Sequence, residues 1–287
     1  MSVSEAPPRK LNFGCGYDKR EGYLNVDSDP QCNPDLLIVD NDLSVLGRCD
    51  FDEILALDVL EHIPRQKTLD VLLEWADLLV DGGTLNLKTS SILGVAAQLD
   101  GNPSFRDQYG WTICLFGNQA HPGDFHHTGF TELTLSVYLL AAGFRIDRMW
   151  MTDKWLLHAE ATKVRSWSSL VERSSELDDE AFLRLAYREI LDRDIDEPAL
   201  GHFLPSLGDG TIDRRWVVQQ LASSLERLFL VAHHNGFEGE RQRVQAGARF
   251  VPPAAKPALR KLAISARELS TRARRAWGSR RRRTPLN

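Results

Sequence analysis

The fold is decided by residues 10–16, which read Lys-Leu-Asn-Phe-Gly-Cys-Gly, and by residues 23–27, which read Tyr-Leu-Asn-Val-Asp. The first apolar run stops at Gly14 and Gly16, and the second stops at Asp27. In an open α/β sheet, ligands bind at the carboxyl ends of the parallel strands. Glycine lets the backbone turn sharply and approach a ligand, and an aspartate can accept hydrogen bonds from a ribose diol. Together the two endings indicate a nucleoside-containing cofactor.

The spacing around the two glycines narrows the choice of cofactor. A dinucleotide fingerprint has a third glycine and an acid about 20 residues further on, and a P-loop ends in Gly-Lys-Ser/Thr. Here Lys19 stands at the third glycine position, Asp27 comes early, and no P-loop ending follows. The pattern favours adenosine without phosphates. The alternative is a plain strand and turn with packing glycines.

Residues 51–64, Phe-Asp-Glu-Ile-Leu-Ala-Leu-Asp-Val-Leu-Glu-His-Ile-Pro, are the second informative string. With LNFGCG at residues 11–16 and GYLNVD at residues 22–27, this string resembles the class I S-adenosylmethionine-dependent methyltransferases, and most closely a small bacterial type. The resemblance covers residues 9–165. It implies an α/β fold with a Rossmann-like, mostly parallel sheet, an antiparallel closing hairpin, and S-adenosyl-L-methionine as the cofactor.

Hydrophobic periodicity predicts the elements between these motifs. We expect a strand near residues 35–40, a helix over 68–80, a strand over 84–88 and a helix over 131–142. Residues 145–152 and 155–163 are typical of a closing hairpin, whereas residues 90–119 show no clear period and predict an irregular stretch. This β-loop-α alternation indicates a parallel sheet covered by helices.

The resemblance also implies which residues bind the cofactor. The turn residues Phe13, Gly14, Cys15 and Gly16 would face its methionine part, and Asp27 would bind its ribose. The loop after the third strand would lie near its adenine, with Asp40, Asp42 and Leu43. Leu57 and Asp58 at the end of the fourth strand would border its methyl group, followed by Glu61 and His62 at the start of the next helix. For Glu61 and His62 the alternative is helix-start electrostatics and packing. The chain departs from the family at Asn12, where many members carry an acid.

A histidine-rich segment at residues 121–130 contains His121, His126 and His127. One of them could be a general base, since the ordinary histidine pKa is about 6.5, and the preferred order is His127, His126, His121. With Asp124 they could instead bind a divalent metal, although neighbouring histidines on extended backbone point apart, so we predict no metal site. The third interpretation is that they hydrogen-bond within the loop and cap the next helix.

A second unit is predicted at residues 175–235, with helices over 177–193, 197–207 and 211–225. The string AFLRLAYREILDRDIDEPALGHFLPSL at 181–207, followed by SSLE at 223–226, resembles a small helical domain of unknown function related to phycobilisome linker repeats. Because such bacterial domains often accompany enzymes of surface glycans, the resemblance implies a glycan or sugar-containing acceptor. The alternative is a generic helical bundle for packing or homo-oligomer formation.

The end of the chain has a different charge. Residues 240–287 contain 14 Lys+Arg and 2 Glu, a net charge of +12, so residues 1–239 carry −5 − 12 = −17. Residues 255–283 predict a basic amphipathic helix with Trp277, which suits an anionic membrane surface. Nucleic acid is a less favoured partner, and a tail held against the acidic body is the third interpretation.

Composition sets the outer limits. The 287 residues suffice for a methyltransferase domain at 1–165, a helical domain at 175–235 and a basic tail at 240–287. No apolar stretch reaches the ~18 residues of a membrane span, the polar N-terminus is not typical of a secretory signal, and the scattered cysteines indicate a cytoplasmic protein, peripheral on the inner membrane if the tail binds there. We therefore expect a methyltransferase acting on an oxygen of a sugar or surface-glycan precursor. The alternatives are a non-catalytic binding or assembly protein on the same scaffold, and an RNA or protein methyltransferase.

Overall fold

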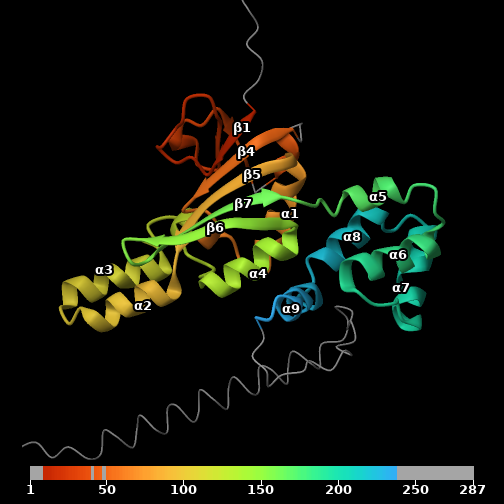
Figure 1. The fold of residues 1–287 in the computed structure, drawn as a ribbon. Helices are drawn as coiled ribbons and strands as arrows, with labels where there is room; N and C mark the ends of the chain where they lie inside the picture. Colours follow the sequence, from red (N-terminus) through yellow and green to blue (C-terminus); the bar gives the residue numbers. More distant parts are fainter. Residues whose placement is uncertain (1–8, 40–41, 47–49, 238–287) are drawn as a thin grey trace, which may run out of the picture. The chain divides into compact units, whose positions relative to one another are not determined.

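The computed structural model describes residues 9–39, 42–46 and 50–237. Its centre is a seven-stranded sheet in the order β3-β2-β1-β4-β5-β7-β6 (Figure 1). The strands are β1 Lys10–Phe13, β2 Leu24–Asp27, β3 Leu36–Leu37, β4 Phe51–Leu57, β5 Leu79–Ser90, β6 Phe144–Thr152 and β7 Leu156–Lys163. Strands β1 to β5 are parallel, and β7 runs antiparallel to both β5 and β6. The predicted Rossmann-like sheet with an antiparallel closing hairpin is confirmed.

The strand register brings the ends of the central strands to one edge of the sheet. Phe13 at the end of β1 lies beside Val26 of β2 and Ala56 of β4. Leu57 at the end of β4 lies beside Lys88 of β5. The glycine turn after β1, the acid that ends β2 and the loop after β4 therefore share this edge, as the topology rule for α/β sheets requires.

Two helices, α1 (Thr68–Leu78) and α4 (Glu132–Ala142), pack against each other and cover one face of the sheet (Figure 1). Alternate strand residues point to this face, and Leu11, Ile54 and Leu85 are fully buried there. The Phe13 ring meets the Trp75 ring of α1 edge to face, with centroids 5.2 Å apart. This layer is the hydrophobic core that positions the strand ends.

The opposite face of the sheet carries polar side chains. Lys10 pairs with Glu53 at 2.9 Å, and the Asn86 amide donates to the same carboxylate at 2.8 Å. Within the described residues, the links from β1 to β4 contain only the short 3-10 turns η1 (Pro30–Cys32) and η2 (Leu43–Leu46). The expected helical cover is therefore present where α1 and α4 lie, and the polar face is stabilised by its own ion pairs.

The prediction of an irregular stretch at residues 90–119 is wrong. Two helices, α2 (Ile92–Gly101) and α3 (Phe105–Phe116), lie side by side there (Figure 1). Ser91 and Ser104 cap their N-termini by accepting backbone N–H bonds. Helix α3 buries none of its residues, so its sequence lacks the apolar period that marks a helix packed on a core.

The C-terminal helices are α5 (Ser169–Arg173), α6 (Asp179–Leu191), α7 (Glu197–Gly208), α8 (Arg214–Ala222) and α9 (Leu225–His234). The predicted helices near 177–193 and 197–207 are confirmed as α6 and α7. The helix predicted over 211–225 is confirmed as α8, whereas α9 was not predicted; it begins where Ser224 accepts a bond from the Arg227 N–H and caps its first turn. Helix α9 packs on α4, and Gln219 of α8 donates to Asp70 of α1 at 3.1 Å.

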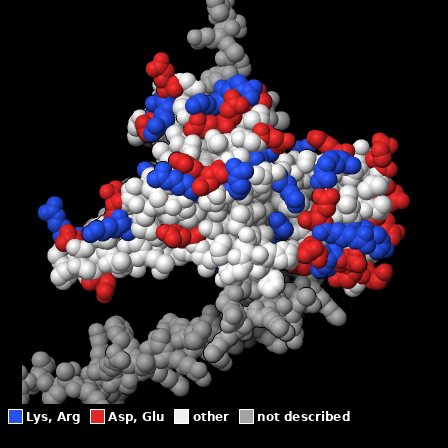
Figure 2. Space-filling model, viewed as in Figure 1, with Lys and Arg blue, Asp and Glu red and all other residues white. Residues whose placement is uncertain are grey.

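On the face shown in Figure 2, basic and acidic side chains are interleaved over α5 to α8. Among the described helices, none has the length and apolar character needed to cross a bilayer. The basic tail predicted at 240–287 lies outside the described residues, and the predicted domain boundaries at 165 and 175 stay predictions.

Gly143 at the end of α4, compared with Gly210 after α7, allows a test of the close contact between α4 and Arg165. Gly143 has φ +99°, and a Cβ there would lie 2.4 Å from the Arg165 carbonyl oxygen, whereas Gly210 has φ +75° and open space around it. We expect Gly143→Ala to lower the free energy of unfolding by more than about 2 kcal/mol and Gly210→Ala by about 1 kcal/mol. Urea denaturation followed by circular dichroism measures both. Equal losses would show that the Arg165 contact is not important.

Candidate functional site

The glycine turn is held to the end of β2 by a carboxylate. Gly14 and Gly16 have φ of +64° and +49°. The Gly16 N–H donates to Asp27 Oδ2 at 2.7 Å, and the Asp29 N–H donates to Oδ1 of the same carboxylate at 2.9 Å. A Cβ on Gly14 would lie 2.5 Å from a methyl of Val59, whereas a Cβ on Gly16 would meet nothing within 4 Å. Gly14 therefore permits packing inside the protein, and Gly16 opens to the surface.

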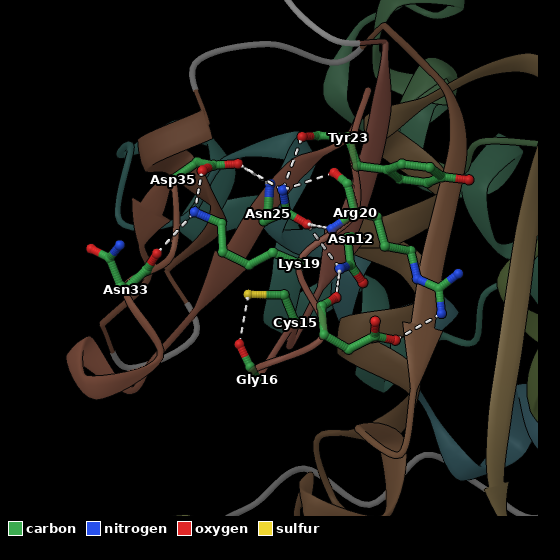
Figure 3. A network of polar contacts seen from close by, with 10 residues as sticks. Asn12, Cys15, Gly16, Lys19, Arg20, Tyr23, Asn25, Asn33 and Asp35 are labelled. Atoms are coloured by element: carbon green, nitrogen blue, oxygen red, sulfur yellow. Dashed lines mark hydrogen bonds and ion pairs between the residues drawn. The ribbon is translucent and has the colours of Figure 1, made fainter.

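Behind the turn lies a buried pair of amides (Figure 3). The Asn12 side chain donates to the Asp18 carbonyl at 2.9 Å and to Asn25 Oδ1 at 3.0 Å. Asn25 in turn donates from its side chain and its backbone to Asp35 Oδ2, at 2.8 and 2.9 Å. Lys19 at 2.7 Å and these bonds lower the pKa of Asp35 to about 2. Asn12 thus stabilises the loop that carries the glycines.

The residues implied for adenine are only partly visible. Asp40 lies outside the described residues, together with Asn41. Asp42 accepts the Ser44 N–H at 3.0 Å, and hydrogen bonding by the Ser44 side chain, followed by this backbone bond, lowers the pKa of the Asp42 carboxyl. Leu43 is half-buried at the start of η2. Leu37, which lies beside Asp27 in the sheet, and Val39 are exposed. These two apolar side chains, which the sequence did not single out, form an apolar surface beside Asp27.

The end of β4 is marked by unusual backbone. Asp58 has φ +57°, a conformation that costs a non-glycine residue about 1–3 kcal/mol and is common at functional sites. Its N–H donates to the Lys88 carbonyl at 2.9 Å, and its carboxylate pairs with Lys88 Nζ at 2.6 Å. Leu57 before it is half-buried. The turn thus presents the Asp58 carboxylate at the edge of the sheet.

The helix start expected at Glu61 and His62 is not found there, and Glu61 is buried. These residues form the 3-10 turn η3 (Leu60–His62), and α1 begins later, at Thr68. The Glu61 carboxyl is 2% exposed and accepts a bond from the Thr89 hydroxyl at 2.9 Å. Burial raises its pKa to about 7. Its carbonyl oxygen accepts the N–H groups of His127 and Thr128 at 2.8 and 3.0 Å, so Glu61 joins β5 to the histidine-rich loop.

His126 and His62 form an edge-to-face pair, with ring centroids 4.7 Å apart. The two rings lie 3.1 and 3.2 Å, through Nδ1, from the carbonyl oxygens of Cys114 and Phe125 respectively. Since only an N–H can donate to a carbonyl, each Nδ1 carries the proton. Burial lowers the pKa of both histidines. At neutral pH both rings are therefore uncharged and keep a lone pair on Nε2.

The other two loop histidines have different surroundings. His121 Nδ1 accepts the Gly123 N–H at 3.2 Å, and its Nε2 lies 3.1 Å from Asp124, which matches the loop-stabilising interpretation. His127 is exposed, with its ring nearly parallel to Phe125 at 6.1 Å. In the part of the chain that the structure describes, no group of three or more His, Cys, Asp or Glu side chains could hold a metal ion.

Lys88 and His158 were not predicted as site residues, although they lie at the same edge. They are directly opposite each other in the β5–β7 pair. Neither belongs to a motif, and a single sequence gives no register between strands 70 residues apart. Only the alternation of each strand could have indicated that they share a face.

Comparisons with known proteins give one family match. Residues 165–230 match a family model described as "Domain of unknown function (DUF4214)". A search of the curated proteins found no match.

Solved structures that resemble the chain include several methyltransferases. One is the 1,6-didemethyltoxoflavin-N1-methyltransferase of Burkholderia thailandensis with S-adenosylhomocysteine bound, at 19% identity, covering 54% of this chain and 71% of that chain, with a TM-score of 0.39. Another is a SAM-dependent methyltransferase from Methanosarcina mazei, at 20% identity, 54% and 92% coverage and a TM-score of 0.38. A Bordetella parapertussis structure described as that of "a possible exported protein" matches at 13% identity, with 55% and 63% coverage and a TM-score of 0.38, so the chain spans less than two thirds of that protein. The fold assignment itself rests on the strand order.

The buried Glu61 makes stability depend on pH. Its pKa is about 7 in the folded chain against an ordinary 4.5, so the folded state binds more protons between these values. The stability contributed by protonated Glu61 is present below pH 4.5 and is lost as the pH rises through 7. We expect wild type to lose on the order of 3 kcal/mol across this range through Glu61.

Urea unfolding at pH 5 and pH 8 measures this loss. Glu61→Gln keeps a neutral, hydrogen-bonding side chain and should abolish this part of the pH dependence, whereas the exposed Glu132→Gln should keep it. The same pH dependence in Glu61→Gln and wild type would contradict the assignment.

Proposed function

We propose that the chain is an S-adenosyl-L-methionine-dependent methyltransferase. The observation that carries the proposal is the glycine turn at positive φ, held by the Asp27 carboxylate at the β1–β2 end of a Rossmann-like sheet. Asp27 uses one acceptor position on each oxygen and keeps further lone pairs, so it can also accept from a ribose diol.

The connection after the turn supports a cofactor without phosphates. Phosphate-binding loops lead into a helix, whose N-terminal N–H groups and dipole attract the anion. Residues 14–23 contain no helix and run directly into β2. Gly16 opens to free space, and the apolar Leu37 and Val39 suit an adenine ring. The residues present therefore fit S-adenosylmethionine better than a dinucleotide.

The reaction that we propose is methylation of an oxygen of a sugar or surface-glycan precursor. The bound cofactor would supply a methyl group already activated on a sulfonium. The protein then has to orient the acceptor hydroxyl in line with that methyl group and accept its proton. For the proton we propose a loop histidine, in the order His127, His126, His121; the uncharged ring of His126 supports such a role. The glycan acceptor is supported by the resemblance of residues 175–232 to helical domains that accompany glycan enzymes.

A non-catalytic binding or assembly protein is the second candidate. It is favoured by Asn12, whose amide is buried and engaged in the loop network instead of facing a ligand. Many methyltransferases that the sequence resembles carry an acid at the position of Asn12. Without that acid, we expect a cofactor to be bound more weakly. Measured affinity decides between the two candidates.

Two glycines in the same loop test cofactor binding. Gly16 and Gly22 both have positive φ and free space for a Cβ, but only Gly16 lies in the turn held by Asp27. We expect Gly16→Ala to weaken S-adenosylhomocysteine binding at least about tenfold, equivalent to ~1.4 kcal/mol, and Gly22→Ala to leave it unchanged, as measured by isothermal titration calorimetry. Absence of binding to wild type, or equal effects of the two changes, would refute the methyltransferase proposal.

We also propose that residues 240–287, which lie outside the described residues and carry a net charge of +12, bind an anionic membrane surface. We expect the full chain to cosediment with vesicles containing phosphatidylglycerol, more weakly at high salt, because exposed charges are screened. A chain ending at residue 242 should stay in solution. Equal sedimentation of both, or tighter binding of the full chain to RNA at physiological salt, would contradict it.

A further inference from the structure

A row of polar side chains crosses four neighbouring strands at the site edge of the sheet. Asp58 follows the end of β4, Lys88 lies beside it on β5, His158 lies opposite Lys88 on β7, and Trp150 lies opposite His158 on β6. Lys88 and His158 alternate with buried residues, and Trp150, which is paired with His158, lies on the same polar face of the sheet. Asp58, which the resemblance places beside the methyl group of the cofactor, connects the row to the cofactor site, whereas Lys88, His158 and Trp150 are not among the residues implied to bind the cofactor.

His158 is held in a defined orientation. Its Nε2 lies 2.9 Å from the Thr152 hydroxyl, and its ring stacks on Trp150 with centroids 4.9 Å apart and planes 12° from parallel. Burial, and then the charge of Lys88, lower its pKa, while Asp58 and Asp153 act in the opposite direction. The neutral ring leaves Nδ1 without a partner among the described residues. A fixed imidazole with one unused nitrogen can donate to or accept from a hydroxyl group.

Asp58 joins this row to the histidine-rich loop. Its carboxylate pairs with Lys88 at 2.6 Å. It also lies close enough to His62, His126 and His158 for its charge to oppose the lowering of their pKa values by burial. Asp58 is also the residue with strained backbone at the end of β4. The loop and the row are therefore two sides of one site around this carboxylate.

We propose that Asp58, Lys88 and His158 bind the methyl acceptor, and that the acceptor presents an uncharged, hydroxyl-rich ring to them. This inference rests on the proposed methyltransferase function and adds the residues that hold the acceptor and the charge of the group they hold.

The charge of the row selects the ligand class. Lys88 is already neutralised by Asp58, and His158 is uncharged, so the three side chains have no net charge. A phosphate or carboxylate binds best to unpaired cations, above all to arginine forks. Neighbouring hydroxyls of a sugar ring, in contrast, can donate to the Asp58 carboxylate and accept from Lys88, and can do either with His158. A neutral sugar ring fits the row better than a sugar phosphate.

Saturation-transfer NMR on the full chain tests this. The probes are methyl α-D-mannopyranoside and methyl β-D-galactopyranoside as neutral rings and glucose 1-phosphate as the charged one, each with and without S-adenosylhomocysteine. The variants are Lys88→Met and His158→Asn. The control is Lys10→Met, because Lys10 also pairs with a carboxylate across two strands of the same face, at 2.9 Å, but away from the site edge.

We expect the neutral sugars to give signals that fall at least about fivefold in Lys88→Met and His158→Asn and persist in Lys10→Met, with unchanged S-adenosylhomocysteine affinity by calorimetry in all variants. A second readout is the pKa of His158, followed by NMR of the ring protons, which should shift when the sugar is added. Binding of glucose 1-phosphate alone, no neutral sugar signal, or equal signals in Lys88→Met and Lys10→Met would overturn the inference. Failure of S-adenosylhomocysteine to bind wild type would refute the proposed function instead, and the sugar signals without it would then decide the inference.

Discussion

The hydrogen bond from the Gly16 N–H to the Asp27 carboxylate is the contact on which the rest of the site depends. It closes the end of β1 onto the end of β2 and keeps the turn at positive φ, without the helix that usually follows such a turn. The Asn12–Asn25 amide pair takes over the supporting role, since it anchors residues 18–25 from behind. A buried amide pair holds position well, because leaving either amide unsatisfied would cost about 1–3 kcal/mol.

A second constraint acts on the other side of the edge. Glu61 is buried between β5 and the histidine-rich loop, and its own carbonyl oxygen receives two N–H groups of that loop. The loop is therefore positioned by backbone hydrogen bonds, and the histidine side chains are free to differ in role. His121 stabilises the loop, His126 packs on His62, and His127 faces solvent. A loop-stabilising role for His121 is therefore compatible with a general-base role for another histidine of the same loop.

The elements that the sequence predicted well are those that pack on the core. The helix at 68–80 and the helix at 131–142 each bury an apolar stripe, so periodicity located them. Helix α3 buries nothing, and its sequence therefore carries no such signal. Helix α9 begins where Ser224 acts as a cap. The sequence alone does not tell whether a serine in a helical pattern caps a new helix or lies inside one. The residues from Phe13 to Asp27 could be proposed for the cofactor from the sequence because they are adjacent in it, and that assignment stays a prediction.

By itself, the sequence determined the class of sheet, the glycine turn and the acid that faces it, because strand periodicity and glycine placement are local properties. Only the tertiary structure decided that Asp58, Lys88 and His158 lie in one row, that Glu61 is buried, and that Asn12 supports a loop. These facts depend on the register between strands and on the packing of distant segments, which no local pattern encodes. The physical reason is that a strand's side chains alternate between two faces, and the neighbours on each face come from elsewhere in the chain.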